Sequence, residues 1–333
     1  MLYGALLRLR NALYDRGGRA VRRASLPVLS VGNITVGGTG KTPFVGWLSR
    51  ELQSRGRRPA VVSRGYRGRA GRGPLTVSDG RGPVVTADRC GDEPFMLAQT
   101  LPGVVVVVGS NRFLGVEAAA RLGADVAILD DGFQHRGLAR ELDIVLLDAG
   151  NPFGHDRLLP AGLLREPVRG LKRADVVLIT RSDPDDAIAT IEKAIREHNT
   201  RAPILRAGHR ALGLFDGRGE AADPPRRAVA FCGIGNPDRF RVDLESQGLE
   251  LVAFRAHRDH HPFAAHEIAE LHALAAEQRA ALITTRKDRT RIGGELSNGL
   301  DDPPLLTLEI EVQIHDPGPL CDAVSRALER DGR

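Results

Sequence analysis

Short runs of β-branched and aliphatic residues recur along the first two-thirds of the chain, with helical patterns between several of them. Such runs are typical of strands that are buried on both faces of a parallel sheet. They cover residues 26–33, 59–63, 103–109, 124–131, 142–150 and 174–180. Helical patterns occupy residues 43–55, 111–122 and 185–198. The alternation predicts a three-layer α/β/α domain with a mostly parallel sheet over residues 1–205.

A second set of strand-like runs lies nearer the C-terminus. Residues 206–226 are rich in Gly, Arg, Asp and Pro, which predicts a linker. After it, apolar runs at 227–235, 249–254, 280–285 and 305–312 alternate with helical stretches. We therefore expect a smaller α/β domain over residues 227–333.

The first 23 residues combine an apolar helical stripe with many arginines. Leu2, Leu6, Leu9 and Leu13 follow helical spacing, and cations flank them. This composition is typical of a helix that lies in a membrane interface, although a helix packed on its own domain would also show such a stripe. No uninterrupted run of roughly 20 apolar residues predicts a helix that spans a bilayer.

Composition narrows the classes of partner. The formal net charge is +5 and the pI is about 9.5, so the surface should attract nucleic acid, acidic membranes or phosphorylated small molecules. A basic stripe interleaved with aromatic residues is missing from the sequence, so nucleic acid is not expected as a partner. Three widely separated cysteines form neither a metal clip nor a disulfide framework.

The strongest local motif is SVGNITVGGTGKTPF at 30–44, a strand and a glycine-rich loop that leads into a helix. Such a loop turns backbone N–H groups towards phosphates, while Lys41 would reach the β and γ oxygens and Thr42 a Mg²⁺ ion. The strict GxxxxGK[ST] pattern fails, because Thr35 stands where glycine is required. A simple glycine turn is the alternative. The predicted nucleotide-binding residues are Gly37, Gly38, Thr39, Gly40, Lys41 and Thr42.

Acidic residues follow two further elements. Asp130 and Asp131 end a buried strand in VAILDDGFQH, where a nucleoside-triphosphate enzyme holds Mg²⁺, or where a strand simply leaves the core. Asp92 and Glu93 in GDEP begin a helix, where a carboxylate also serves as an ordinary cap. The SRGYRG segment at 63–68 suits anion binding or stacking, and equally a solvated turn.

Three of the ten histidines lie within HRDHHPF, at His257, His260 and His261. The segment has no accompanying Cys and no HExxH-type spacing, so a zinc site is disfavoured. A histidine beside Asp259 can instead polarise a hydroxyl, as phosphoryl transfer to an alcohol requires.

Taken together, these segments resemble the tetraacyldisaccharide 4′-kinase family of lipid A biosynthesis. The motifs that carry the resemblance are GNITVGGTGKTP, SRGYRG, GDEP, DDGFQH, LPAGLLREP (159–167), GIGNP (233–237), DHHPF (259–263) and TTRKD (284–288). Their order and spacing cover nearly the whole chain. The resemblance implies a P-loop NTPase-like fold, with ATP and Mg²⁺ as cofactors and a tetraacyldisaccharide 1-phosphate as the acceptor.

The resemblance also implies roles for individual residues. Asp92 matches the catalytic acid, expected to act as a base with a histidine that maps to His260, and Lys41 serves ATP. The implied metal-site residues are Thr42, Glu93, Asp130 and Asp131. The implied substrate-binding residues are Arg64, Tyr66, Arg112, His135, Arg165 and Glu166.

The resemblance further implies a peripheral, monotopic enzyme at the cytoplasmic face of the bacterial inner membrane, held by its N-terminal helix. No obligate protein partner is expected. The competing interpretation is a P-loop ATPase or GTPase of the metal-chaperone or membrane-targeting type. Such a protein would share the loop and Asp130, but it would need neither His260 nor a lipid-facing helix.

Overall fold

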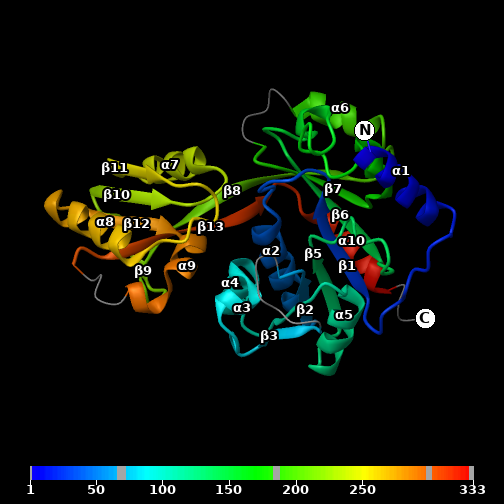
Figure 1. Cartoon of the computed structure of the whole chain (residues 1–333), viewed down its shortest axis with the longest axis horizontal. Helices are drawn as coiled ribbons and strands as arrows, with labels where there is room; N and C mark the ends of the chain where they lie inside the picture. Colours follow the sequence, from blue (N-terminus) through cyan, green and yellow to red (C-terminus); the bar gives the residue numbers. More distant parts are fainter. Residues whose placement is uncertain (1, 66–72, 183–187, 298–301, 330–333) are drawn as a thin grey trace. The chain divides into compact units, whose positions relative to one another are not determined.

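The computed structural model describes residues 2–65, 73–182, 188–297 and 302–329. It divides into two compact units, each built from a sheet with helices on both faces (Figure 1). Unit 1 contains residues 1–208 and 312–333, and unit 2 contains residues 209–311. Unit 2 is therefore an insertion in the sequence of unit 1.

The sheet of unit 1 has the strand order β8-β7-β6-β1-β5-β2-β4-β3. Its neighbouring strands pair in parallel, except that β3 runs antiparallel to β4 at the edge. The strands are β1 (Val28–Asn33), β2 (Pro59–Ser63), β3 (Leu75–Asp79), β4 (Val105–Val108), β5 (Val126–Asp130), β6 (Leu142–Asp148), β7 (Val176–Thr180) and β8 (Ile204–Phe215). Most of their side chains are buried, as the apolar runs predict.

Helices cover both faces of this sheet. On one face, α2 (Lys41–Ser54), α3 (Ala87–Cys90), α4 (Asp92–Thr100) and α10 (Gly318–Glu329) share one apolar core with alternate strand residues. On the other face lie α5 (Arg112–Arg121), α6 (Ile188–Arg196) and the 3₁₀ helix η2 (Val168–Arg173). The remaining elements of unit 1 are α1 (Leu2–Asp15) and η1 (Gly154–Asp156).

Unit 2 repeats this architecture on a smaller scale. Its parallel strands follow the order β11-β10-β12-β13, and β9 pairs antiparallel with the end of β8. The strands are β9 (Ala221–Ala222), β10 (Arg227–Cys232), β11 (Glu250–Ala256), β12 (Ala281–Thr285) and β13 (Leu305–Ile314). One face is covered by α7 (Pro237–Ser246), and the other by α8 (Ala265–Glu277) and α9 (Arg286–Ser297).

The mostly parallel α/β fold expected from the sequence is confirmed, but the boundaries differ from those expected. The expected linker at 206–226 contains most of β8 and all of β9, which carry backbone hydrogen bonds. The C-terminal residues from Val312 belong to unit 1, because Leu320 and Val324 of α10 pack into its core. The edge strand β3 is also absent from the predicted set.

Gly32 in β1 lies directly against the segment after β5. A Cβ atom at this position would lie 2.5 Å from Phe133 Cβ and 2.7 Å from Phe133 N. Phe133 is fully buried, so neither group has room to move. Only glycine lets β1 and the segment after β5 pack this tightly.

We expect Gly32→Ala to destabilise unit 1 by about 1–3 kcal/mol, because the new methyl group overpacks the core against backbone. The matched control is Gly46→Ala in α2, where the added Cβ meets only the end of the Arg50 side chain at 3.7 Å. That variant should gain about 0.5–1 kcal/mol from helix propensity. Urea denaturation followed by the fluorescence of Trp47, the chain's single tryptophan, reports on unit 1. Equal stability of the two variants would contradict the close approach.

Candidate functional site

The carboxyl ends of the parallel strands of unit 1 meet at one edge of the sheet, where open α/β folds bind ligands. The glycine loop follows β1, and Asp131 follows β5. β1 lies between β5 and β6, so the chain crosses it when it passes from β5 to β6. The two strongest sequence motifs are therefore neighbours at this edge.

Side chains from two strands hold the glycine loop in place. Thr39 is buried, and its hydroxyl accepts a hydrogen bond from Asn33 Nδ2 at 3.1 Å. Thr180 at the end of β7 donates to the Thr39 carbonyl at 3.1 Å, and the Arg181 guanidinium donates to the Gly38 carbonyl. Gly40, at φ 78°, precedes Lys41, the first residue of α2. The positive end of the α2 dipole therefore faces the loop, as in a phosphate cradle.

Asp131 lies at the centre of the site. Its two carboxylate oxygens accept hydrogen bonds from Arg165 at 2.5 and 2.8 Å, and Lys41 Nζ lies 3.7 Å from Oδ1. Burial opposes ionisation, but these cations outweigh it and lower the pKa of Asp131 to about 2. Asp131 has φ 56°, a left-handed conformation that non-glycine residues seldom adopt. The fold holds this residue in a strained backbone conformation so that a charged carboxylate faces the lysine.

Asp130, next to it, behaves in the opposite way. Its side chain is buried, and burial together with the nearby charge of Glu93 raises its pKa to about 7. Lys41 lowers the pKa by a smaller amount, and Asp131 raises it further. The two consecutive acids thus differ: cations keep Asp131 charged, whereas Asp130 loses its proton only near neutral pH.

The two residues of the RE pair, Arg165 and Glu166, bind different partners. Arg165 binds Asp131 and also donates to Asn33 Oδ1 at 3.1 Å. Glu166 is buried, accepts from Gln134 at 2.8 Å and pairs with Arg173 at 2.7 Å. Glu166 therefore fixes the segments behind the site, whereas Arg165 belongs to the site itself.

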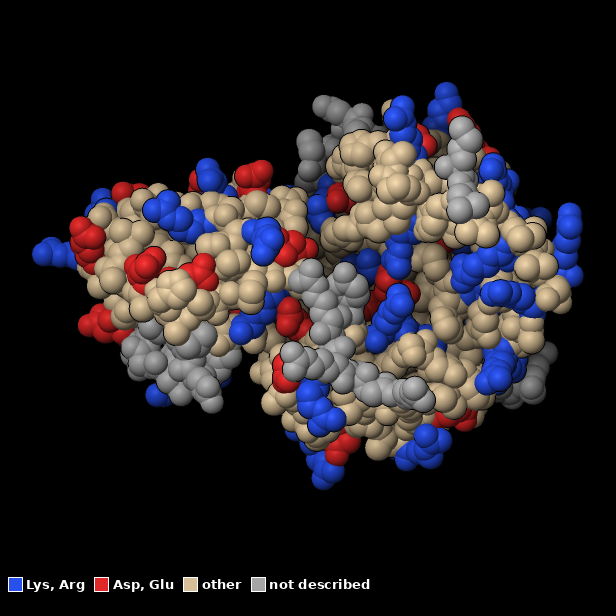
Figure 2. Space-filling view, in the orientation of Figure 1, with Lys and Arg blue, Asp and Glu red and all other residues tan. Residues whose placement is uncertain are grey.

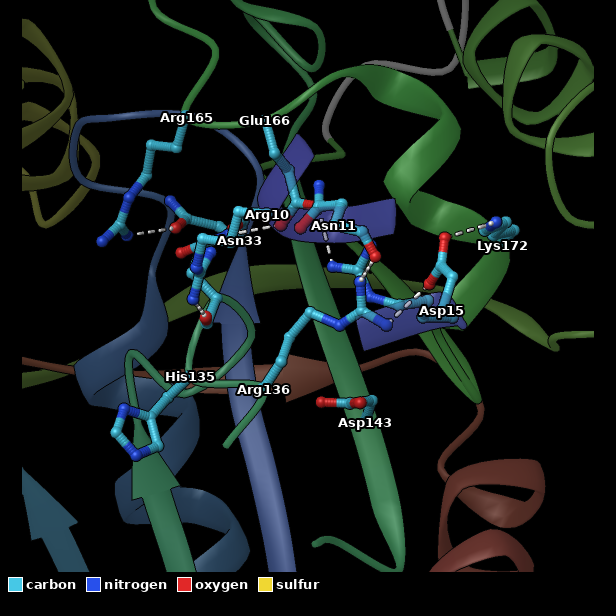
Figure 3. Close-up of polar contacts among 12 residues, drawn as sticks. Arg10, Asn11, Asp15, Asn33, His135, Arg136, Asp143, Arg165, Glu166 and Lys172 are labelled. Atoms are coloured by element: carbon cyan, nitrogen blue, oxygen red, sulfur yellow. Dashed lines mark hydrogen bonds and ion pairs between the residues drawn. The ribbon is translucent and has the colours of Figure 1, made fainter. Parts of the chain in front are cut away.

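The N-terminal helix α1 is attached to these same segments (Figure 3). Tyr3 donates to the Arg165 carbonyl at 3.1 Å, and Arg10 to the Gln134 carbonyl at 2.5 Å. Arg136 donates to the Asn11 carbonyl and to Asp15. Thus α1 docks on unit 1 through its polar side.

The other side of α1 is apolar and exposed. Leu6 is 57% exposed, Leu9 60% and Leu13 38%. Hence Leu6, Leu9 and Leu13 of the predicted stripe do not face the core of their own unit. No helix within the described ranges is long and apolar enough to cross a membrane.

Of the other predicted substrate-binding residues, Arg112 lies near enough to Arg64, His135 and the Asp130–Asp131 pair for their charges to interact. Arg64 is exposed after β2, whereas Arg112 is buried at the start of α5 and donates to the Gly109 carbonyl. His135 is half-buried, and burial together with the Arg112 charge lowers its pKa to about 4, so it is neutral at pH 7. Tyr66 lies outside the described residues.

Asp92 and Glu93 begin α4, directly after Gly91 at φ 93°. Both lie in the first turn, where the helix dipole favours negative charge. The Asp92 charge also contributes to the raised pKa of the neighbouring Cys90 thiol, which burial sets mainly. Gly91 occupies the N-cap position and no side chain caps α4, so the capping alternative does not account for these two acids, and Glu93 is electrostatically coupled to Asp130.

In unit 2, His260 is held by a network that the TTRKD motif builds. Asp288 is fully buried and accepts hydrogen bonds from Gly233 N at 3.0 Å and from Arg291 at 2.6 Å. Arg291 also lies 3.1 Å from His260 Nδ1, and Lys287 Nζ lies 3.3 Å from Nε2. With φ 64°, His260 is a further strained residue at a predicted site.

The other two histidines of the cluster form a separate group. His257 stacks on His261 at 4.3 Å, and His261 Nε2 lies 3.0 Å from Glu267. Ligand atoms of these three residues lie within 4.8 Å of one another, which the linear spacing does not reveal. Glu267 also accepts from Ala264 N at the start of α8, so the arrangement serves as a helix cap.

Several residues that support the sites were not among the predicted site residues. Asn33, Thr180 and Arg181 support the glycine loop, and Arg291 holds His260. Asn33 and Thr180 end otherwise apolar strands, which is a recognisable signal. Arg181 and Arg291 are two among many arginines, and only the fold distinguishes them.

Comparisons with known proteins agree with this geometry. The chain matches the family described as tetraacyldisaccharide-1-P 4′-kinase (LpxK) over residues 1–329. It is 43% identical to the tetraacyldisaccharide 4′-kinase of Geobacter sulfurreducens, covering 98% of this chain and 91% of that protein. It is 42% identical to the tetraacyldisaccharide 4′-kinase of Geobacter metallireducens, covering 98% and 95%.

A solved structure matches as well. The crystal structure of LpxK from Aquifex aeolicus in complex with ATP superimposes with a TM-score of 0.80 at 32% identity, covering 98% of this chain and 96% of that one. Both the family match and these relatives extend over both units. The chain therefore belongs to the tetraacyldisaccharide 4′-kinase family.

Proposed function

We propose that this enzyme transfers the γ-phosphate of ATP to the 4′-hydroxyl of a tetraacyldisaccharide 1-phosphate, a step in lipid A biosynthesis. The observation that carries the proposal is the glycine loop with Lys41 facing the Asp130–Asp131 pair, in a chain that matches the kinase family from residue 1 to 329. The solved relative is a complex with ATP. A P-loop ATPase or GTPase that acts as a switch is not favoured, because the family match also includes unit 2.

In the donor half, the loop and Lys41 bind the phosphates of ATP. Arg165 fixes the Asp131 carboxylate by donating to both of its oxygens. The fixed carboxylate in turn holds Lys41 in position through their ion pair. The acidic residues Asp130 and Glu93 suit Mg²⁺. Burial and the charge of Glu93 raise the pKa of Asp130, and a bound cation would relieve the repulsion between the two carboxylates. Thr42, Asp130 and Glu93 would hold Mg²⁺, which supplies neutralisation of phosphate charge when bound.

In the acceptor half, Asp92 is proposed to take the proton from the sugar hydroxyl. A sugar hydroxyl is a weak nucleophile, so a positioned base is typically worth about 10²–10⁴-fold in rate. The role expected of His260 in this step stays a prediction. Its two ring nitrogens lie beside Arg291 and Lys287, which can only donate, so a neutral imidazole accepts a hydrogen bond from one of them.

The acylated acceptor fits an enzyme at the cytoplasmic face of the inner membrane. The exposed leucines of α1 support a peripheral attachment in which the helix lies in the interface. Because α1 is hydrogen-bonded to the Arg165 segment, an enzyme bound in this way keeps its donor site close to the bilayer surface.

Labelled ATP and the disaccharide monophosphate in detergent micelles test the transfer directly. The wild-type enzyme should move label to the lipid, and Lys41→Ala should lower kcat/KM by about 10²–10³-fold, because one charge-stabilising donor is lost. Lys193→Ala, an exposed lysine on α6, is the matched control and should retain wild-type rates. ATP consumption that is independent of the acceptor would instead indicate a nucleotide switch.

We expect Asp92→Asn to lower kcat by about 10²–10⁴-fold while ATP affinity stays nearly unchanged. Asparagine keeps a polar group at the start of α4 but cannot take a proton. Asp88→Asn on α3 removes one exposed acid of the same kind and should behave as wild type. Steady-state kinetics with saturating acceptor and a nucleotide-binding titration separate the two quantities. An unchanged kcat in Asp92→Asn would refute the assignment of the base.

The raised pKa of Asp130 predicts how the stability of the ligand-free enzyme depends on pH. The folded state binds this proton more tightly than the unfolded state, so the contribution is full below about pH 4 and is lost as pH rises through about 7. The loss should be on the order of 4 kcal/mol. Asp130→Asn should lose this contribution to the pH dependence, while Asp88→Asn should keep it. Urea denaturation across this pH range measures the difference, and parallel curves for wild type and Asp130→Asn would exclude the buried, repelled carboxyl.

A further inference from the structure

His257, His261 and Glu267 form a cluster in unit 2 that is separate from the contacts of His260. Their possible ligand atoms, one from each residue, all lie within 4.8 Å of one another. His257 directly follows β11, where its N–H donates to the Cys232 carbonyl at 2.8 Å, and Glu267 lies in the first turn of α8. Two regular elements and the segment between them therefore supply the three groups.

The buried side chain of Phe263 supports both imidazole rings. Its ring meets those of His257 and His261 edge to face, with 5.3 and 4.9 Å between the ring centroids. The His261 side chain is 20% exposed and that of Glu267 is 26% exposed. The cluster thus rests on an apolar wall and remains within reach of an ion from solvent, and such a hydrophobic shell is typical of protein metal sites.

The helix cap described above uses only part of this cluster. It needs one oxygen of Glu267, Oε2, which accepts from the Ala264 N–H at 2.8 Å. It gives no role to Oε1, which lies 3.0 Å from His261 Nε2, or to the His257 ring that stacks on His261. Burial lowers the pKa of His257, so this ring is neutral at pH 7, which is the form that binds metal ions.

The donor set suits zinc. Two imidazole nitrogens and one carboxylate oxygen are the protein ligands of zinc sites that keep a fourth position for water. His257 and His261 also have the H-x₃-H spacing of zinc ligands. The expectation against zinc considered the HRDHHPF segment alone, and Glu267 lies outside it. Tetrahedral bonds of about 2.1 Å place ligand atoms about 3.4 Å apart, so a small contraction of the cluster accommodates the ion.

The charge around the cluster is local. Figure 2 shows Asp and Glu interspersed with Lys and Arg on the face of unit 2 that it draws, without a broad field of one sign. Glu267 and Asp288, by contrast, both place negative charge near the His257 ring. Affinity for a cation therefore depends on the ligands themselves.

We propose that His257, His261 and Glu267 bind one Zn²⁺ ion, with water in the fourth position. The proposal does not rest on the proposed function, because none of these three residues is assigned a part in phosphoryl transfer. The ion joins the end of β11 to the start of α8. Asp259 and His260 lie between two of the ligands in the sequence, so the bound ion also restrains the segment that carries them.

Titration of the full-length, metal-free enzyme with Zn²⁺ against a chromophoric chelator tests the site without ATP or acceptor. Excess Mg²⁺ in the buffer occupies the oxygen ligands of unit 1. The wild-type enzyme should bind one ion per chain, and Co²⁺ in its place should give the intense visible absorption of tetrahedral coordination. His257→Gln should weaken Zn²⁺ binding by at least about 100-fold, since loss of a ligand costs more than loss of an outer hydrogen-bond partner.

Glu267→Gln separates a metal site from a helix cap. Glutamine still accepts from the Ala264 N–H, so the cap persists, but its amide is a poor zinc ligand and binding should fall at least about tenfold. The matched control is His266→Gln, which removes an exposed imidazole from the same helix and should bind Zn²⁺ as wild type does.

Thermal denaturation gives a second measurement. Zn²⁺ should raise the midpoint of the wild-type enzyme and of His266→Gln, because it binds the folded state, and it should leave His257→Gln and Glu267→Gln unchanged. Undiminished Zn²⁺ binding in Glu267→Gln would mean that the cluster is a cap only. Equal losses in all three variants would indicate adventitious binding by surface histidines. Either result, or a wild-type enzyme that takes up no Zn²⁺, would overturn the proposal.

Discussion

The ion pair between Asp131 and Arg165, with Lys41 beside it, is the interaction on which the rest of the site depends. It joins three parts of the chain: the loop after β5 with Asp131, the LPAGLLREP segment with Arg165, and the start of α2 with Lys41. Removing one partner of such a partly buried pair leaves an uncompensated charge, which costs more than the pair itself contributes. The pair therefore specifies the arrangement of the loops more than it stabilises the fold.

The same constraint explains why two consecutive acids differ so strongly. Asp131 uses the available cations, and Asp130 is left with burial and the repulsion of Glu93. One carboxylate is thus fixed in the charged form, while the other has a pKa near 7 and is suited to a cation that arrives with the nucleotide. Negative charge is therefore fixed on Asp131 and not on Asp130. This difference assigns the positioning of Lys41 to Asp131 and metal binding to Asp130.

Sequence patterns predicted the parts of the fold that are periodic and locally specified. The buried parallel strands and the glycine loop follow directly from apolar runs and from loop chemistry. The edge strand β3 is as long as the predicted β2, but Thr76, Ser78 and Asp79 interrupt its apolar pattern, so the sequence does not distinguish it from a loop. The association of α10 with unit 1 depends on long-range packing, which no local pattern encodes. The same holds for Arg181 and Arg291, whose partners lie far away in the sequence.

The position of α10 has a consequence for how the enzyme is made. Leu320 and Val324 pack into the core that also contains Phe44 and Leu48 of α2, and Arg55 donates to Ser325 at 2.8 Å. The ribosome must therefore complete all of unit 2 before the layer behind the glycine loop can close. A chain that ends before α10 leaves apolar surface of β6 uncovered, and a nascent chain cannot pack this core fully until α10 has emerged.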